Sequence, residues 1–132
     1  MKECKILIVD DDLDDVEILS SALQDTGVDR VHYEHTAMQA FIYLESIQLP
    51  AKLPKLIVID AYLPGITGAE FLADLKQMEL YKAIHVIVLS TLKTEKEIER
   101  YRQLGAIDYL VKPNSYEEYV KVAADIKSKI DL

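Results

Sequence analysis

Four short apolar runs in this chain each end in polar residues whose side chains can do chemistry. These residues are, in chain order, Asp10 and Asp11, then Asp60, then Ser90 and Thr91, and finally Lys112. Carboxylates hold divalent cations, an ammonium and a hydroxyl neutralise phosphoryl oxygens, and a lone carboxylate can attack phosphorus in line. The residue types therefore favour phosphoryl transfer, provided that the fold brings the four groups together.

The three aspartates predict a divalent cation. Carboxylates packed together do not all ionise without a counter-charge. Oxygen ligands without nearby cysteine or histidine favour Mg²⁺. Asp60 is the better candidate for the nucleophile because it stands alone at the end of its run, whereas Asp10 and Asp11 are better placed to hold the metal.

The apolar runs predict the strands of a parallel sheet. Strands without regular polar alternation are typical of sheets buried on both faces. The four runs of this kind are Ile6–Val9, Leu56–Ile59, Val86–Leu89 and Ile107–Val111. A weaker, alternating run at residues 31–35 predicts an edge strand. Ligands of open parallel sheets bind beyond the carboxyl ends of the strands, so the polar residues are expected to meet at one edge.

Segments with helical spacing of apolar residues separate the runs. Five such β-α units imply right-handed crossovers and helices on both faces of the sheet. Gly27 and Gly105 are expected to end the first and fourth helices. Asp12 is expected to cap the first helix, with Asp14 and Asp15 favourable to its dipole.

Two further local signals concern the last helices and one loop. Residues 94–97 and 115–118 have the pattern of capping boxes, which predicts that the last two helices begin there. The segment 48–54 contains two prolines and is expected to hold no helix. The chain has no repeat or linker, so the expectation is one domain over residues 1–132 with no output domain.

Composition and charge exclude several classes of function. The chain has 132 residues, of which 50% are hydrophobic, and a net charge of −8. A protein this acidic is repelled by phosphate backbones and anionic lipids, which argues against direct binding to nucleic acid or membranes. A single cysteine, Cys4, fits a reducing compartment. The start of the chain has no apolar signal region, and no apolar run approaches membrane-spanning length. The expected location is the cytoplasm.

The motifs, in their order and spacing, resemble the receiver domain of two-component response regulators. The residues that carry the resemblance are Val9-Asp10-Asp11, Asp60-Ala61-Tyr62-Leu63-Pro64 with Gly68, Ser90-Thr91 and Lys112-Pro113. One short motif is weak because such motifs recur by chance. Four of them at successive strand ends, covering essentially the whole chain, are a specific match.

The resemblance implies the fold and a role for each site residue. The fold is flavodoxin-like, a doubly wound (βα)5 parallel sheet with strand order 2-1-3-4-5. Asp60 resembles the phospho-acceptor and Tyr109 the aromatic switch residue. The implied Mg²⁺ ligands are Asp10, Asp11, Asp60 and the backbone carbonyl of Tyr62. Ser90 and Lys112 resemble the residues that bind the phosphoryl group, and the Lys112–Pro113 bond is expected to be cis.

The implied function is that of a single-domain response regulator, a signalling protein rather than an enzyme. A sensor histidine kinase would supply the phosphoryl group. A downstream protein, or a second copy, would bind the face made by the fourth helix, fifth strand and fifth helix. The run of three acids at residues 10–12, Leu63-Pro64 and the proline-containing loop before the third strand are similar to stand-alone regulators that partner bacterial phytochrome-type kinases.

Two other functions stay open from the sequence. A haloacid-dehalogenase-like phosphatase would use Asp10 as nucleophile and Asp12 as acid/base, but Asp14 stands where that family usually has Thr or Val. A receiver-fold binding module could work without phosphate. Within the receiver hypothesis, bulky Tyr62 and apolar Leu92 predict slow loss of the phosphoryl group to water.

Two possible roles remain for each of two sets of residues, four tyrosines and a group of cations. The tyrosines could cluster at an interface or form core edges; they are Tyr101, Tyr109, Tyr116 and Tyr119. The cations around the fourth helix could help a partner dock, although a solvated face is the simpler reading; they are Lys93, Lys96, Arg100 and Arg102.

Overall fold

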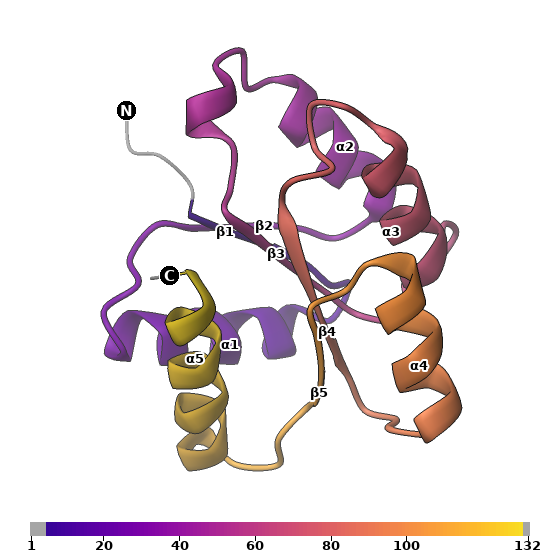
Figure 1. The fold of residues 1–132 in the computed structure, drawn as a ribbon. Coiled ribbons are helices and arrows are strands. Elements are labelled where there is room, and N and C mark those ends of the chain that lie inside the picture. The colour runs from indigo at the N-terminus through magenta and orange to yellow at the C-terminus, as the bar shows by residue number, and fades with distance from the viewer. Residues whose placement is uncertain (1–4, 131–132) are drawn as a thin grey trace.

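Five short strands form one parallel sheet with helices on both faces (Figure 1). The computed structural model describes residues 5–130. The strands are β1 (Ile6–Val9), β2 (Val31–Glu34), β3 (Leu56–Ile59), β4 (His85–Ser90) and β5 (Asp108–Val111). Their order is β2-β1-β3-β4-β5, which confirms the flavodoxin-like topology.

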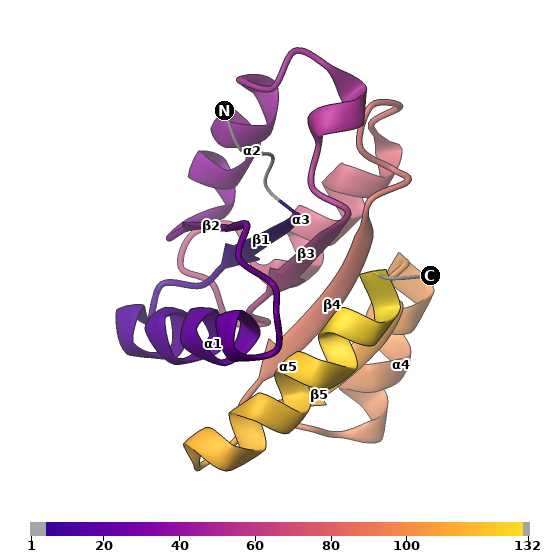
Figure 2. The same ribbon diagram turned by 90° about the vertical axis from the view of Figure 1, so that its left-hand side faces the viewer.

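Helices from both ends of the chain cover one face of the sheet, and the middle helices cover the other. The helices are α1 (Leu13–Asp25), α2 (Ala37–Glu45), α3 (Gly68–Gln77), α4 (Glu95–Leu104) and α5 (Tyr116–Ile130). Figure 2 shows α1 and α5 on the face opposite α2 and α3. Successive strand residues alternate between the two cores, because strand side chains alternate in direction. Ile6 packs toward α1 and α5, whereas Leu7 packs with α2 and α3.

The strand register brings the carboxyl ends of the central strands level with one another. Val9 lies beside Ile59, and Ile59 lies beside Val88. The residues that follow these strands therefore emerge side by side. The backbone extends this alignment, since the Asp60 N–H donates to the Val9 carbonyl at 3.0 Å and the Lys112 N–H donates to the Ser90 carbonyl at 2.7 Å.

The helix ends confirm some local predictions and refine others. Asp12 caps α1 and accepts a hydrogen bond from the Asp15 N–H, as expected. Thr94 and Ser115 accept bonds from the N–H groups three residues later. A reciprocal capping box is formed instead by Thr67 and Glu70 at the start of α3, which the sequence analysis missed.

Three details of the chain path differ from expectation. The segment 48–54 does contain one helical turn, a short 3₁₀ helix at Pro50–Lys52, because proline fits the first turn of a helix, where its missing N–H is not needed. The last strand begins at Asp108 rather than one residue earlier. The Lys112–Pro113 bond is trans, since residues 5–130 contain no cis peptide. Trans is the lower-energy isomer, and Lys112 reaches the site with it.

Candidate functional site

Three aspartates meet at the carboxyl edge of the sheet. One carboxylate oxygen each from Asp10, Asp11 and Asp60 lies within 4.8 Å of the others. Asp10 and Asp60 are buried, with exposed fractions of 5% and 9%, whereas Asp11 is exposed. The ends of β1 and β3 place them, and the tight strand register keeps them close. The predicted acidic cluster is therefore present.

Lys112 lies at the centre of this acidic cluster. Its Nζ is 2.8 Å from Asp10 Oδ2 and 3.2 Å from Asp60 Oδ2. Its third carboxylate partner is Asp15, at 2.7 Å. From the sequence, Asp15 is expected only to favour the helix dipole, so this contact was not predicted. Asp15 lies in the first turn of α1, close after the strand end that carries Asp10, but the sequence does not show that Lys112 reaches it.

Burial and neighbouring charges have opposing effects on the pKa of Asp10 and on that of Lys112. Burial raises the pKa of Asp10 to about 6, against the opposing effect of the Lys112 ammonium. Burial alone would lower the pKa of Lys112, but its bonds to Asp10 and Asp15 outweigh that effect and raise it above the usual range. One fixed positive charge thus faces an excess of carboxylates, which is an environment that favours a further cation.

The turn after Asp60 contacts and orients the Asp60 carboxylate. The Tyr62 N–H donates to Asp60 Oδ1 at 3.1 Å. Gly68 packs so tightly here that an added Cβ would lie 2.6 Å from the Asp60 carbonyl oxygen. The Tyr101 hydroxyl, from α4, donates to the Ala61 carbonyl at 3.3 Å. One Asp60 oxygen is therefore oriented by backbone, and the turn contacts α4 directly.

Ser90 and Tyr109 lie together beside this turn. Ser90 is fully buried, and its Oγ accepts a bond from the Leu92 N–H at 3.3 Å. The Tyr109 side chain is turned inward, only 5% exposed, with its hydroxyl donating to the Leu92 carbonyl at 2.6 Å. Burial raises the pKa of Tyr109, so the phenol stays protonated and able to donate. Both residues thus contact the loop between β4 and α4.

The four tyrosines do not form one surface cluster. Tyr101 and Tyr109 belong to the core under α3 and α4, with ring centroids 5.7 Å apart. Tyr119 belongs to the opposite core, under α1 and α5, and Tyr116 is exposed. The core reading is correct for three of the four. The sheet separates them, since α4 and α5 lie on opposite faces.

The two arginines of α4 pair with acids of the same helix. Arg102 Nη2 lies 2.5 Å from Glu99 Oε2, and Arg100 lies 3.7 Å from Glu97. Lys93 and Lys96 are exposed. These pairs are solvated and contribute little to stability.

The donor set of the acidic cluster suits a hard divalent cation. All of its ligand atoms are oxygens, and the three carboxylates are close enough to share one ion. Nothing in residues 5–130 offers a thiolate or an imidazole to this group. Divalent metal binding fits the residues present.

The sequence of the chain matches those of response regulators. A model of the response regulator receiver domain matches residues 6–124. The response regulator Rcp1 of Synechocystis is 29% identical over 93% of this chain and 86% of its own length. The phosphate regulon transcriptional regulatory protein PhoB of Pseudomonas aeruginosa is 33% identical over 87% of the chain, but the chain spans only 48% of that protein.

Solved structures agree with the fold. The phosphorylated cyanobacterial phytochrome response regulator RcpA superposes with a TM-score of 0.82 at 29% identity, covering 96% of this chain and 93% of that one. The Mn²⁺-bound form of Rcp1 gives a TM-score of 0.80 at 27% identity, with the same coverage. The expected similarity to phytochrome-associated regulators is confirmed. Within residues 5–130, no helix combines the length and apolarity that crossing a membrane requires. The chain belongs to the response regulator receiver domain family.

Proposed function

We propose that this chain accepts a phosphoryl group on Asp60 from the phosphohistidine of a sensor kinase. The Oδ2 atom of Asp60 attacks phosphorus, the P–N bond to the imidazole breaks, and the leaving imidazole takes up a proton from solvent. The bond from the Tyr62 N–H to Asp60 Oδ1 supports this assignment, because it orients one carboxylate oxygen and leaves Oδ2 toward Lys112. That oriented, buried carboxylate is the observation on which the proposal rests.

The remaining site residues are assigned around that step. Asp10, Asp11, Asp60 and the backbone carbonyl of Tyr62 would hold Mg²⁺, which when bound neutralises charge on phosphoryl oxygens. Lys112 is positioned to move its hydrogen bond from Asp60 to a phosphoryl oxygen. The Ser90 hydroxyl would donate a hydrogen bond to a second phosphoryl oxygen.

The proposed output is a change in binding, not turnover of a substrate. Engaging Ser90 would pull on the loop that also holds the Tyr109 hydroxyl through Leu92. Phosphorylation would thereby bias Tyr109 and the surface of α4, β5 and α5 toward one of two states. The reader of that surface is a downstream protein or a second copy of the chain. By analogy with the phytochrome response regulator RcpA, we propose a phytochrome-type kinase as the donor and the cytoplasm as the location of the chain.

The proposal is tested by treating the chain with acetyl phosphate and Mg²⁺ and mapping the product by tryptic digestion. We expect a labile phosphate on the peptide that contains Asp60, and none after chelation of the metal. Asp60→Asn should abolish labelling, whereas Asp74→Asn, an exposed acid of α3, should leave it unchanged. Labelling of another aspartate, or continuous release of phosphate with Asp10 as the labelled residue, would contradict it.

A further inference from the structure

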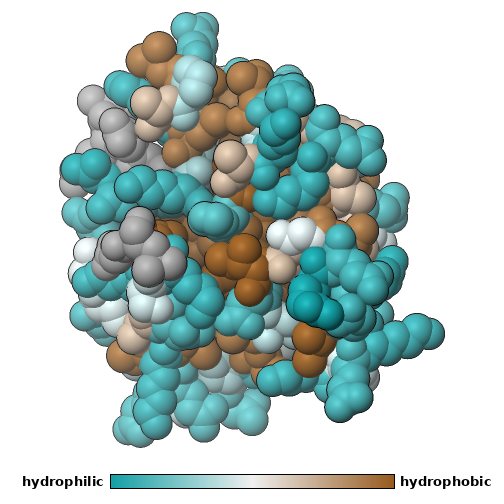
Figure 3. Space-filling view, in the orientation of Figure 1, coloured by the Kyte–Doolittle hydropathy of each residue, from teal (hydrophilic) through white to brown (hydrophobic). Residues whose placement is uncertain are grey.

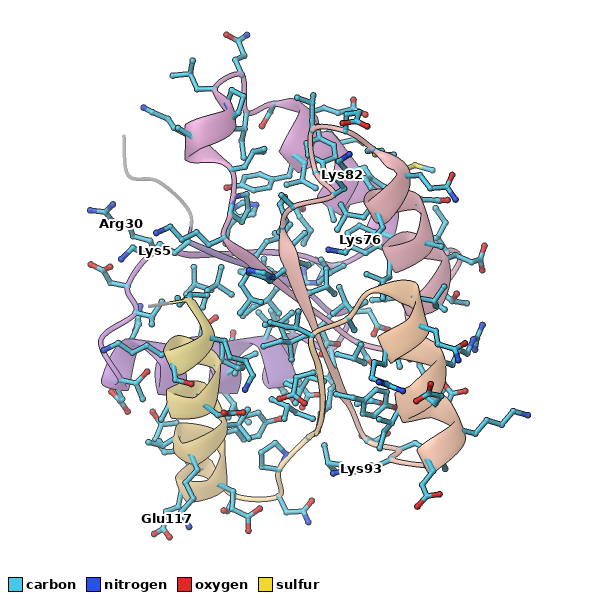
Figure 4. The ribbon with its side chains drawn as sticks, in the orientation of Figure 1. Lys5, Arg30, Lys76, Lys82, Lys93 and Glu117 are labelled. Carbon is cyan, nitrogen blue, oxygen red and sulfur yellow. The ribbon has the colours of Figure 1, made fainter. Side chains whose placement is uncertain are left out.

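The amino-terminal ends of three neighbouring strands carry a row of basic residues. This end of the sheet is opposite the one that carries the acidic cluster. Arg30, Lys5 and Lys55 each stand directly before a strand, namely β2, β1 and β3. These three residues, in that spatial order, are named the basic row. Backbone bonds join them, because the Lys5 N–H donates to the Arg30 carbonyl at 2.8 Å and the Lys55 N–H donates to the Lys5 carbonyl at 3.0 Å. Figure 4 shows Lys5 and Arg30 next to each other at this end of the sheet.

The charges of the basic row are not neutralised within the described chain. Neighbouring strands lie about 4.8 Å apart, so adjacent members of the row repel one another. Among residues 5–130, no carboxylate forms an ion pair with Arg30, Lys5 or Lys55, and Asp29, next to Arg30 in sequence, is no exception. Lys5 and Lys55 are exposed. Three cations without an acidic partner in the described part of the chain therefore lie side by side in a protein whose net charge is −8.

A cavity continues from the basic row. It has a volume of about 520 Å³ and lies between the 3₁₀ turn, the start of β4 and the end of α5. Lys55 belongs to both the row and the cavity wall, and His85 and Lys129 also line the cavity. The apolar part of the wall includes Leu53, Leu80 and Ile84. Figure 3 shows apolar side chains gathered at the upper end of the molecule, among hydrophilic ones.

We propose that the basic row and this cavity bind an acidic segment of a partner protein, with one apolar side chain in the cavity and flanking carboxylates on Lys5, Arg30 and Lys55. Charge complementarity selects carboxylates, and the apolar wall selects an anchor between them. The overall negative charge of the chain does not prevent this, because charges beyond about 8 to 10 Å are screened at physiological salt. The surface lies at the edge of the sheet opposite Asp60, so docking there leaves the phosphorylation site open.

The test uses a fluorescein-labelled peptide with one leucine between two pairs of glutamates, titrated with the full chain and followed by fluorescence anisotropy. We expect saturable binding that weakens as salt rises. The double variant Lys5→Glu/Lys55→Glu should weaken binding by about tenfold or more. Lys121→Glu, an exposed α5 residue outside the surface, has the same charge change per site and should have little effect. Replacing the peptide's leucine by serine should also weaken binding.

Several results would overturn the proposal. They are the absence of saturable binding at millimolar peptide, equal weakening by Lys121→Glu, and equal binding of a peptide with glutamines in place of glutamates. Competition by single-stranded DNA as strong as that by the peptide would show a general polyanion surface instead. Thermal melting and labelling of Asp60 by acetyl phosphate report whether each variant is folded, and neither measurement requires peptide binding.

Discussion

The carboxyl ends of the strands carry mostly acidic side chains and the amino ends carry basic ones. The acidic side chains share a buried lysine, whereas the lysines at the amino ends are exposed. At the carboxyl edge, Asp10, Asp15 and Asp60 share one lysine, Lys112, whose side chain is only 7% exposed. At the amino edge, the basic row has exposed lysines and no acidic partner among residues 5–130. Water screens exposed charges, whereas buried ones must be paired.

This difference separates a site for chemistry from a surface for docking. A buried group of acids with one counter-charge holds its geometry before any ligand arrives, and preorganised charge is what a transition state requires. Solvated cations instead attract a partner and affect the rate and specificity of its binding.

Removing the central lysine should have the largest effect on stability. Lys112→Met leaves three carboxylates without their shared partner, so we expect the free energy of unfolding to fall by about 3 kcal/mol at pH 7. Urea denaturation measures this change. Lys121→Met is the matched control and should change stability by less than about 0.5 kcal/mol. Equal effects of the two substitutions would show that Lys112 is not structurally required.

Adding Mg²⁺ should stabilise the acidic edge. A cation that binds only the folded chain raises the free energy of unfolding by about 2.7 kcal/mol at a hundred times its Kd. Asp11→Asn should remove most of this gain, because Asp11 is an exposed member of the acidic cluster. Asp74→Asn should keep the full gain. A melting temperature that does not depend on Mg²⁺ would contradict the metal assignment.

The buried Asp10 should make stability depend on pH in a defined direction. Burial raises its pKa from 3.8 to about 6, so between these values the folded chain binds more protons than the unfolded chain. Stability from this group is therefore fully present below the unfolded pKa and is lost as pH rises through the folded one.

Asp10→Asn removes that titration. At pH 7 without Mg²⁺, the substitution should raise the free energy of unfolding by roughly 1 to 3 kcal/mol, and the gain should vanish near pH 3. Urea denaturation at several pH values measures both. A destabilised variant at pH 7 would mean that the bond from Asp10 to Lys112 outweighs the cost of burying its charge.

Tyr62 is expected to slow the loss of a phosphoryl group from Asp60 to water. Its side chain is 52% exposed, and its N–H donates to Asp60, so the ring can hinder water that approaches a phosphoryl group on Asp60. Tyr62→Asn should speed the decay of phospho-Asp60 by about threefold to tenfold, equivalent to roughly 1 kcal/mol in the barrier. Release of labelled phosphate measures the decay, and equal rates in both proteins would refute the shielding role.

The smallest expected effect concerns the amino edge. Lys5→Met relieves repulsion from Arg30 and Lys55, so it should stabilise the chain by a few tenths of a kcal/mol at low ionic strength. The gain should disappear in about 1 M salt, where charges are screened within about 3 Å. A loss of stability would show that Lys5 pairs with an acid after all, and would weaken the docking proposal.

Much of the fold and site could be predicted because the relevant signals are local or periodic. Apolar runs such as Ile6–Val9 predict buried strands, and Asp12 before a helical pattern predicts a cap; both are confirmed. The prediction that no helix forms in the segment 48–54 was wrong because it ignored the position of proline within a helix. The 3₁₀ turn at Pro50–Lys52 shows that proline excludes helix interiors but not first turns. The sequence left open whether the four tyrosines form an interface or core edges, because chain order does not show which face of the sheet a helix covers.

By itself, the sequence determined the β-α alternation, the sheet order implied by the receiver resemblance, and the identity of the acidic and basic residues at the strand ends, because these depend on side-chain type and short-range spacing. The contact of Asp15 with Lys112, and that of Tyr101 with the turn after Asp60, depend on how the helices pack on the sheet. The tertiary structure also decided that Arg30, Lys5 and Lys55 stand side by side. These contacts join residues far apart in sequence, and strand register and helix packing alone set which of them meet.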